Sequence, residues 1–205
     1  MKAAIFANGD VNDYDFLKQI VKKYDYIIAC DGGLHHCHRL SIRPNHIIGD
    51  FDSVSAEILE YYQNVPVTRF IPEKDFTDLE LAIDHANKIK ATELDLLGGF
   101  GGRFDHQLAN VHVLTQAKMP ITMRDETTCL RIVDSSCELS VNDGVLVTLL
   151  PFTHIVEGIT TVGLKYPLNG ESLQIGYARG VSNEIVDELA EVCVRVGKLV
   201  VVQIK

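Results

Sequence analysis

Short apolar runs alternate with helical patterns over the first part of the chain, residues 1–120. The apolar runs predict buried strands at residues 3–7, 26–30, 46–48, 67–70 and 94–97. Between them, apolar residues at helical spacing predict helices around residues 16–21, after Ser53, after Thr77 and at residues 105–116. Alternation of this kind implies a mainly parallel sheet with helices on both faces. In such sheets, ligands bind beyond the carboxyl ends of the strands.

The helix expected after Thr77 has the clearest pattern. Its apolar positions fall on one face and are Leu79, Ala82, Ile83 and Ala86. Thr77 and Glu80 have the spacing of a capping box, in which each side chain bonds the backbone of the other residue. We therefore expect this helix to begin at Asp78.

The pattern changes near residue 121. Short β-branched runs, separated by turn sequences such as Asn142-Asp143-Gly144 and Asn169-Gly170, replace the helical spacing. Residues 184–190 are ambiguous between helix and strand. The sequence predicts an α/β domain at residues 1–120 followed by an all-β sandwich at residues 121–205, with a partial barrel as the alternative for the second part.

Composition and charge limit the classes of partner and the cellular compartment that the protein can have. Among the 205 residues, 28 are acidic and 19 are Lys or Arg, giving a net charge of −9 that disfavours binding to nucleic acid. The five cysteines are odd in number and form no CxxC pair, which indicates free thiols in a reducing compartment. No apolar run approaches the ~20 residues needed to span a membrane. We expect a cytoplasmic protein with neither nucleic acid nor membrane as partner.

The run His35-His36-Cys37-His38 has the residue types of a zinc site but not its usual spacing. Adjacent residues on a helix point in different directions and rarely share one ion. We therefore interpret this run as part of a helix.

Two acidic clusters carry the strongest chemical signal. The runs are Gly49-Asp50-Phe51-Asp52-Ser53 and Lys74-Asp75-Phe76-Thr77-Asp78. Carboxylates gathered at one sheet edge repel each other unless a cation lies between them, and hard oxygen ligands favour Mg²⁺. Turn formation and helix capping are the alternative explanation of the same residues.

A glycine-rich segment between a strand and a helix runs from Gly98 to Gly102 and is followed by Arg103-Phe104-Asp105-His106. Glycines let backbone N–H groups approach a ligand, and a helix N-terminus favours anions. The spacing fits neither a Walker motif nor a dinucleotide fingerprint. Arg103 is the candidate phosphate-binding cation, and a flexible loop is the alternative. Taken alone, Asp31-Gly32-Gly33 is a weak signal of a ligand site. The segment from Ala178 to Glu184, taken alone, fits a polar hairpin.

As an ordered set, these motifs resemble the thiamine pyrophosphokinase family. The matching segments are Cys30 to Gly33, Gly49 to Ser53, Asp75 to Asp78, Gly99 to His106, Gly163 to Leu168 and Gly180 to Asn183. The resemblance spans nearly the whole chain. It implies transfer of diphosphate from ATP to the hydroxyl of thiamine, with release of AMP and a requirement for Mg²⁺. It also implies a homodimer, with thiamine held between the α/β domain of one subunit and the β domain of its partner.

The resemblance further implies roles for individual residues. The metal ligands would be Asp50, Asp52 and Asp78, and the catalytic set would add Asp75 and Arg103. Substrate-binding residues would be Asp31, Gly32, Gly33, Lys74, Thr77, Gly102, Asp105, His106, Ser182 and Asn183. Either Asp75 or Asp78 would accept the hydroxyl proton. The chain has no Trp, whereas animal and fungal members place a C-terminal Trp near thiamine.

Two alternatives accompany this interpretation. A related pyrophosphokinase acting on another primary alcohol, such as a hydroxymethylpterin, would keep the acidic clusters and change the β-domain contacts. A non-catalytic thiamine sensor would not need four acids around a metal.

Overall fold

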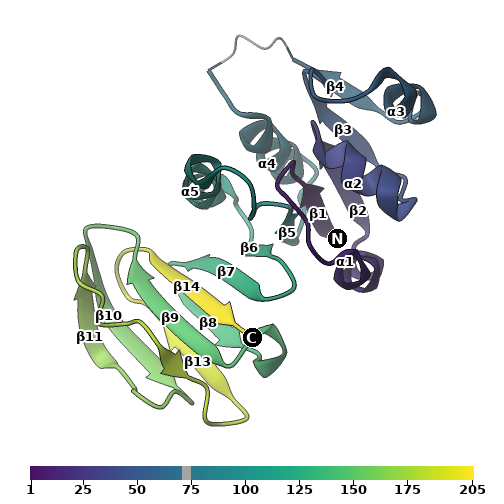
Figure 1. Ribbon diagram of the computed structural model, residues 1–205. Helices are drawn as coiled ribbons and strands as arrows, with labels where there is room; N and C mark the ends of the chain where they lie inside the picture. Colours follow the sequence, from purple (N-terminus) through teal and green to yellow (C-terminus); the bar gives the residue numbers. More distant parts are fainter. Residues whose placement is uncertain (71–74) are drawn as a thin grey trace. The chain divides into compact units, whose positions relative to one another are not determined.

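The computed structural model describes residues 1–70 and 75–205, which form two compact units at residues 1–126 and 127–205 (Figure 1). In the first unit a parallel sheet has the strand order β6-β5-β1-β2-β3-β4. Its strands are β1 (Lys2–Phe6), β2 (Tyr26–Cys30), β3 (His46–Gly49), β4 (Val67–Arg69), β5 (Glu93–Leu97) and β6 (Ile121–Arg124). The α/β fold predicted for the N-terminal part is therefore confirmed.

Helices cover both faces of this sheet (Figure 1). They are α1 (Tyr14–Ile20), α2 (Gly33–Leu40), α3 (Ala56–Tyr61), α4 (Asp78–Lys88) and α5 (Phe104–Val113), with 3₁₀ turns at Val21–Lys23 and Leu114–Gln116. Alternate strand residues face opposite layers, so Ala4 and Phe6 of β1 pack in one core with Leu17 of α1 and Leu34 of α2. Helix α4 packs against β1, β2 and β3 through its own buried face.

The strand order places a change of direction beside β1. The chain adds β2, β3 and β4 on one side of β1, then crosses to add β5 and β6 on the other side. In open parallel sheets, ligands occupy the crevice beyond the carboxyl ends of strands at such a point. The loops that follow β1 and β5 are therefore the expected walls of a ligand site.

The second unit is an antiparallel β sandwich. Its strands are β7 (Thr128–Val133), β8 (Ser136–Leu139), β9 (Leu146–Pro151), β10 (Ile155–Val162), β11 (Asn169–Gln174), β12 (Asn183–Glu184), β13 (Ala190–Cys193) and β14 (Leu199–Ile204), with a 3₁₀ turn at Val141–Asp143. They are ordered β12-β9-β14-β7 in one sheet and β11-β10-β13-β8 in the other. Buried residues from both, including Val147, Leu149, Val156 and Val192, form one core. The predicted sandwich is confirmed.

Two segments differ from the expected assignment. The strand at residues 121–124, grouped above with the sandwich, pairs in parallel with β5, and the division between the units falls after Glu126. The ambiguous segment 184–190 is not a helix, because only its two ends lie in strands, β12 and β13.

All five cysteines are free. No helix within the described ranges has both the length and the apolar character needed to cross a bilayer.

A pair of stacked histidines predicts how stability depends on pH. The rings of His46 in β3 and His85 in α4 lie 4.2 Å apart between centroids. Burial lowers the pKa of both, and the neighbouring His46 lowers that of His85 further. The unfolded chain, in which histidine has a pKa of about 6.5, therefore binds more protons than the folded chain in mild acid.

The contribution of this pair to stability should be fully present above about pH 6.5 and should be lost as the pH falls through that value toward the lowered folded pKa values. We expect the urea midpoint of the His85→Phe variant to fall less between pH 7.5 and pH 5.5 than that of the parent chain. If the urea midpoints of the variant and the parent chain fall equally over this pH range, the histidine pair does not contribute to the pH dependence of stability.

Candidate active site

Three carboxylates converge at the carboxyl edge of the first unit. Asp31 follows β2, Asp50 follows β3, and Asp78 is the first residue of α4. One carboxylate oxygen of each lies within 4.8 Å of the other two. Within residues 1–70 and 75–205, this is the one group of at least three His, Cys, Asp or Glu side chains that converges in this way. We call these three residues the carboxylate cluster.

Asp31 provides the clearest sign that the cluster suits a cation. Its Oδ2 accepts a hydrogen bond of 2.6 Å from the Ser53 hydroxyl, whereas its buried Oδ1 has no hydrogen-bond partner among the described residues. A buried carboxylate oxygen without a partner is costly. A bound cation would satisfy that oxygen and would relieve the repulsion among three acids. Hard oxygen donors of this kind fit Mg²⁺.

The backbone around the cluster is held in uncommon conformations. Asp31 has φ of 45° and Phe51 has φ of 67°, both in the left-handed region that non-glycine residues rarely occupy. Phe51 is buried, with the guanidinium of Arg69 5.3 Å from its ring centroid. Its burial fixes the turn in which the N–H of Asp52 donates to Asp50 Oδ1 at 3.2 Å. Packing of Phe51 therefore maintains a strained backbone at the point where the carboxylates meet.

The carboxylate cluster differs in membership from the expected metal set. Asp50 and Asp78 lie in it as expected, Asp31 joins them from the expected nucleotide-binding set, and Asp52 lies in the turn outside it. Asp75 is exposed and also outside the cluster. Lys74 lies outside the described residues.

Thr77 places Asp78 at the start of α4. The Thr77 hydroxyl accepts from the N–H of Glu80 at 3.2 Å, and the Glu80 carboxylate accepts from the N–H of Thr77 at 2.7 Å. The predicted capping box is therefore confirmed. A helix N-terminus also favours negative charge, so a carboxylate side chain suits this position. This structure thus gives Thr77 a structural role beside its expected substrate role.

Gly32 and Gly33 allow the start of α2 to approach the end of β1 and the loop that follows it. A Cβ at Gly33 would lie 1.9 Å from the backbone oxygen of Phe6, and one at Gly32 would lie 2.2 Å from the side chain of Asn8. Both distances are shorter than any real Cβ contact. The absence of a side chain at Gly32 lets Asn8 pack against the residue that follows Asp31.

We expect Gly33→Ala to lower the free energy of unfolding by about 1–3 kcal/mol, because the Phe6 carbonyl is fixed in β1 and cannot move aside. Gly32→Ala is the matched comparison and should cost less, since the Asn8 side chain can rotate away. Urea unfolding of both variants measures the difference. Equal stability of Gly33→Ala and the parent chain would contradict this packing role.

The glycine-rich segment packs on the loop after β1. The N–H of Gly9 donates to the oxygen of Gly98 at 2.9 Å, and Gly101, with φ of 83°, lies against the backbone of Asp10. Gly102, one of the expected binding residues, is exposed and also has a left-handed φ, of 69°. The segment therefore forms one wall of the crevice predicted by the strand order.

Arg103, Asp105 and His106 lie at the start of α5 and are exposed. The Arg103 Nε donates to Asp105 at 3.1 Å, and its Nη2 donates to the other carboxylate oxygen. This pairing lowers the pKa of Asp105 to about 2, so its carboxylate stays ionised near neutral pH. In this structure Arg103 contacts Asp105 and not the carboxylate cluster.

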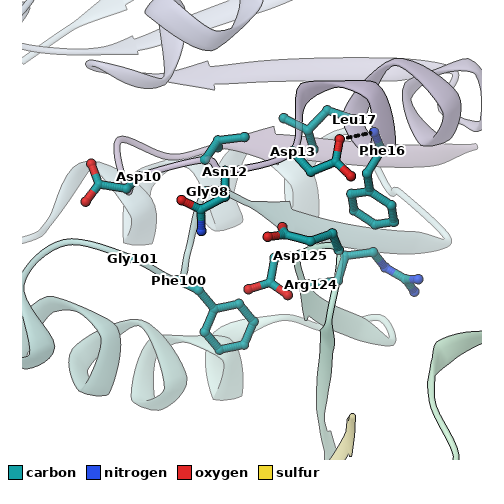
Figure 2. A pocket seen from close by; sticks show the side chains of 12 residues that line it. Asp10, Asn12, Asp13, Phe16, Leu17, Gly98, Phe100, Gly101, Arg124 and Asp125 are labelled. Carbon is teal, nitrogen blue, oxygen red and sulfur yellow. Dashed lines mark hydrogen bonds between the residues drawn. The ribbon is translucent and has the colours of Figure 1, made fainter. Parts of the chain in front are cut away.

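A pocket that is partly open to solvent lies at the carboxyl ends of β1, β5 and β6. Its lining residues are Asp10, Val11, Asn12, Asp13, Phe16, Leu17, Gly98, Phe100, Gly101, Arg124, Asp125 and Glu126. Figure 2 shows Phe100 and Asn12 facing the same space as Asp125, whereas the Arg124 guanidinium turns away from Asn12. That guanidinium pairs with Asp95 at 3.0 Å. The pocket therefore presents carboxylates, an amide and aromatic rings.

Apart from those of the glycine-rich segment, these pocket residues were not predicted from the sequence. The turn at Asn8-Gly9-Asp10 follows a buried strand in the same way as the acidic clusters, and that position was the available signal. Asp125 and Glu126 gave no signal, because residues 121–124 were expected to belong to the sandwich.

In the second unit, the Asn183 side chain bonds backbone groups. Its Oδ1 accepts from the N–H of Tyr166 at 3.0 Å and from that of Glu184, and its Nδ2 donates to the oxygen of Tyr166 at 2.8 Å. Ser182 is exposed with φ of 61°. The structure thus assigns Asn183 to holding the segment at Tyr166, with Ser182 presented beside it.

Comparison with known proteins identifies the family to which both units are similar. The family model of the thiamin pyrophosphokinase catalytic domain matches residues 17–123, and that of the thiamin pyrophosphokinase vitamin B1 binding domain matches residues 135–201. The curated thiamine pyrophosphokinase of Bacillus subtilis is 27% identical over 190 residues, which are 89% of this chain and 88% of that protein. Thiamin pyrophosphokinase 1 of Caenorhabditis elegans is 27% identical over 179 residues, 80% of this chain and 72% of that protein.

Solved structures show the same fold. The crystal structure of thiamin pyrophosphokinase from Geobacillus thermodenitrificans superposes with a TM-score of 0.87 at 27% identity, covering 100% of this chain and 98% of that one. The Bacillus subtilis enzyme gives a TM-score of 0.88 at 23% identity, covering 100% and 99%. Because the catalytic-domain model alone matches more than half of the chain, the protein belongs to the thiamin pyrophosphokinase family.

Proposed function

We propose that this protein transfers diphosphate from ATP to the hydroxyl of thiamine, forming thiamine diphosphate and AMP. The observation that carries the proposal is the carboxylate cluster with its buried, unpartnered Asp31 Oδ1, located in the unit that matches the catalytic domain. Transfer of this kind breaks the bond between the α- and β-phosphates. Positioning and charge stabilisation dominate such reactions, so no nucleophilic side chain is required.

Asp31, Asp50 and Asp78 would hold Mg²⁺, and a bound Mg²⁺ would neutralise charge on the phosphates. Arg103 would supply a second positive charge by exchanging Asp105 for a phosphate oxygen. Of the two candidates for accepting the thiamine hydroxyl proton, Asp75 is the better one, because Asp78 belongs to the carboxylate cluster. Asp52, in the same turn as Asp50, would join the ligand set if the turn closes when nucleotide binds.

The pocket at the ends of β1, β5 and β6 would hold the nucleoside of ATP. Its carboxylates and the Asn12 amide can accept hydrogen bonds from ribose hydroxyls and an exocyclic amine, and Phe100 offers an aromatic face. The same carboxylates repel phosphate. The triphosphate would therefore extend toward the Mg²⁺ held by the carboxylate cluster, along the loop in which Asp10 lines the pocket and Asn8 packs on Gly32, the residue after Asp31.

Further features support the remaining parts of the proposal. Ser182, with the segment held by Asn183, would contact thiamine in the unit that matches the vitamin B1 binding domain. Exposed apolar residues, among them Phe76 and Phe104 at 58% and 76% exposure, support a homodimer with its thiamine sites at the subunit interface. The five free thiols suit a reducing cytoplasm.

Incubation with thiamine, ATP and Mg²⁺, followed by quantification of thiamine diphosphate and AMP, tests the proposal. We expect equal amounts of the two products and no turnover when Mg²⁺ is chelated. AMP release with a hydroxymethylpterin and not with thiamine would instead favour the alternative pyrophosphokinase. Tight thiamine binding without any product would favour a sensor.

A further inference from the structure

His36 of α2 is a buried histidine whose side chain contacts the loop after β1. Its Nε2 lies 3.0 Å from the backbone oxygen of Gly9, and its Nδ1 lies 2.7 Å from the hydroxyl of Tyr14. Because a carbonyl oxygen can only accept a hydrogen bond, Nε2 carries the proton and Nδ1 accepts from Tyr14. Both ring nitrogens are therefore satisfied in one neutral tautomer.

Neighbouring groups hold this tautomer in place. The guanidinium carbon of Arg39 lies 3.8 Å from the ring centroid of Tyr14, which fixes the hydroxyl that donates to His36. Burial lowers the pKa of His36, and the charge of Arg39 acts in the same direction. The imidazole thus stays neutral near neutral pH.

Gly9 is held from a second side by the glycine-rich segment. Its N–H donates to the oxygen of Gly98, and a Cβ at Gly9 would lie 2.3 Å from the oxygen of Phe100. The peptide at Gly9 is therefore fixed between His36 and the pocket wall. Its neighbour Asp10 lines the pocket, while Asn8 packs against Gly32 beside Asp31.

We propose that His36, held by Tyr14, is a positioning residue for nucleotide binding that fixes the loop Asn8–Asp10 between the pocket and the carboxylate cluster. The inference rests on the proposed function, in which this pocket takes the nucleoside of ATP. His36 is buried and is not among the residues that line the pocket. Its loss should weaken nucleotide binding and should leave thiamine binding unchanged.

The test compares His36→Leu, His36→Gln and the control His38→Leu. His38 lies on the same helix, is exposed, and packs edge-on against Tyr61 and Tyr62. Steady-state assays give kcat and the KM for each substrate, and calorimetry with Mg–ATP in the absence of thiamine gives a binding constant that does not require turnover.

For His36→Leu we expect about a tenfold rise in the KM and Kd for ATP, the size of one lost buried hydrogen bond. The values of kcat and of the KM for thiamine should stay within about threefold. His36→Gln should restore most of the ATP affinity, because its side-chain amide can donate to the Gly9 oxygen. His38→Leu should behave like the parent chain.

An unchanged KM for ATP in folded His36→Leu would overturn the inference, and so would equal losses for both substrates that Gln does not rescue. If His36→Leu does not fold, Tyr14→Phe replaces it. We expect Tyr14→Phe to raise the KM for ATP by a smaller factor and to leave the KM for thiamine unchanged. An unchanged KM for ATP in Tyr14→Phe would contradict the inference. A parent chain that binds Mg–ATP but forms no thiamine diphosphate would contradict the proposed function alone, and the Kd comparison would still decide the role of His36. A parent chain that does not bind Mg–ATP would contradict both.

Discussion

Replacing Asp50 with asparagine is expected to slow thiamine diphosphate formation by about 100- to 1,000-fold, the usual effect of removing one charge-stabilising group from a site of this kind. Asn keeps the shape of the side chain and one oxygen but removes the negative charge that a cation requires. Asp50 is only half-buried, so the chain should remain folded. The kcat of the purified variant, together with its thermal unfolding curve, measures both effects.

Asp84→Asn is the matched control. Asp84 lies on α4 with Asp78 and pairs with Lys88 at 2.6 Å on the surface. A surface pair of this type contributes about 0.3–0.5 kcal/mol, so we expect kcat within twofold of the parent value. Near-normal turnover in Asp50→Asn would remove Asp50 from the metal site. A loss in Asp52→Asn as large as that in Asp50→Asn would add Asp52 to the ligands.

Replacing Arg131 with methionine is expected to lower the free energy of unfolding of the second unit by about 3 kcal/mol. Arg131 in β7 is largely buried, pairs with Asp143 and donates to Gln203 Oε1 at 2.8 Å. Gln203 in turn donates to the backbone oxygens of Ser140 and Gly144, both at 2.9 Å. Removing the guanidinium leaves a largely buried carboxylate and a buried amide oxygen without this donor.

Urea unfolding followed by fluorescence and circular dichroism measures this loss. Arg179→Met is the control, because Arg179 pairs with Glu171 at the surface, where the expected loss is about 1 kcal/mol or less. Equal stability of the Arg131 and Arg179 variants would contradict the importance of the buried network. A single transition in one variant and two in the other would show that the two units unfold separately.

Local patterns predicted most of the helices and strands of the first unit. The apolar runs around Ile5 and Ile28 and the helical spacing after Thr77 gave the right elements, because strand and helix periods differ and the Thr77–Glu80 capping box acts locally. The segment at Ile121 was harder to place. Its β-branched residues predicted a strand but did not reveal its partner, because strand pairing is decided by tertiary contacts.

The candidate site was predicted only in outline. Acidic residues after buried strands indicated where carboxylates would gather, because parallel strands end at one edge of a sheet. Which ones converge depends on the left-handed backbone at Asp31 and Phe51, a feature of the folded chain that the residue types do not specify. His36 was missed for a related reason, since its partners Gly9 and Tyr14 are distant in sequence.

The central claim is that the side chains of Asp31, Asp50 and Asp78 hold a cation that also binds the phosphates of ATP. A crystal structure with Mg²⁺ and α,β-methylene-ATP, which cannot be cleaved at the reacting bond, tests it most directly. We predict Mg²⁺ at about 2.0–2.1 Å from oxygens of these carboxylates and of the phosphates. A bound nucleotide whose Mg²⁺ lies away from all three side chains would contradict the account.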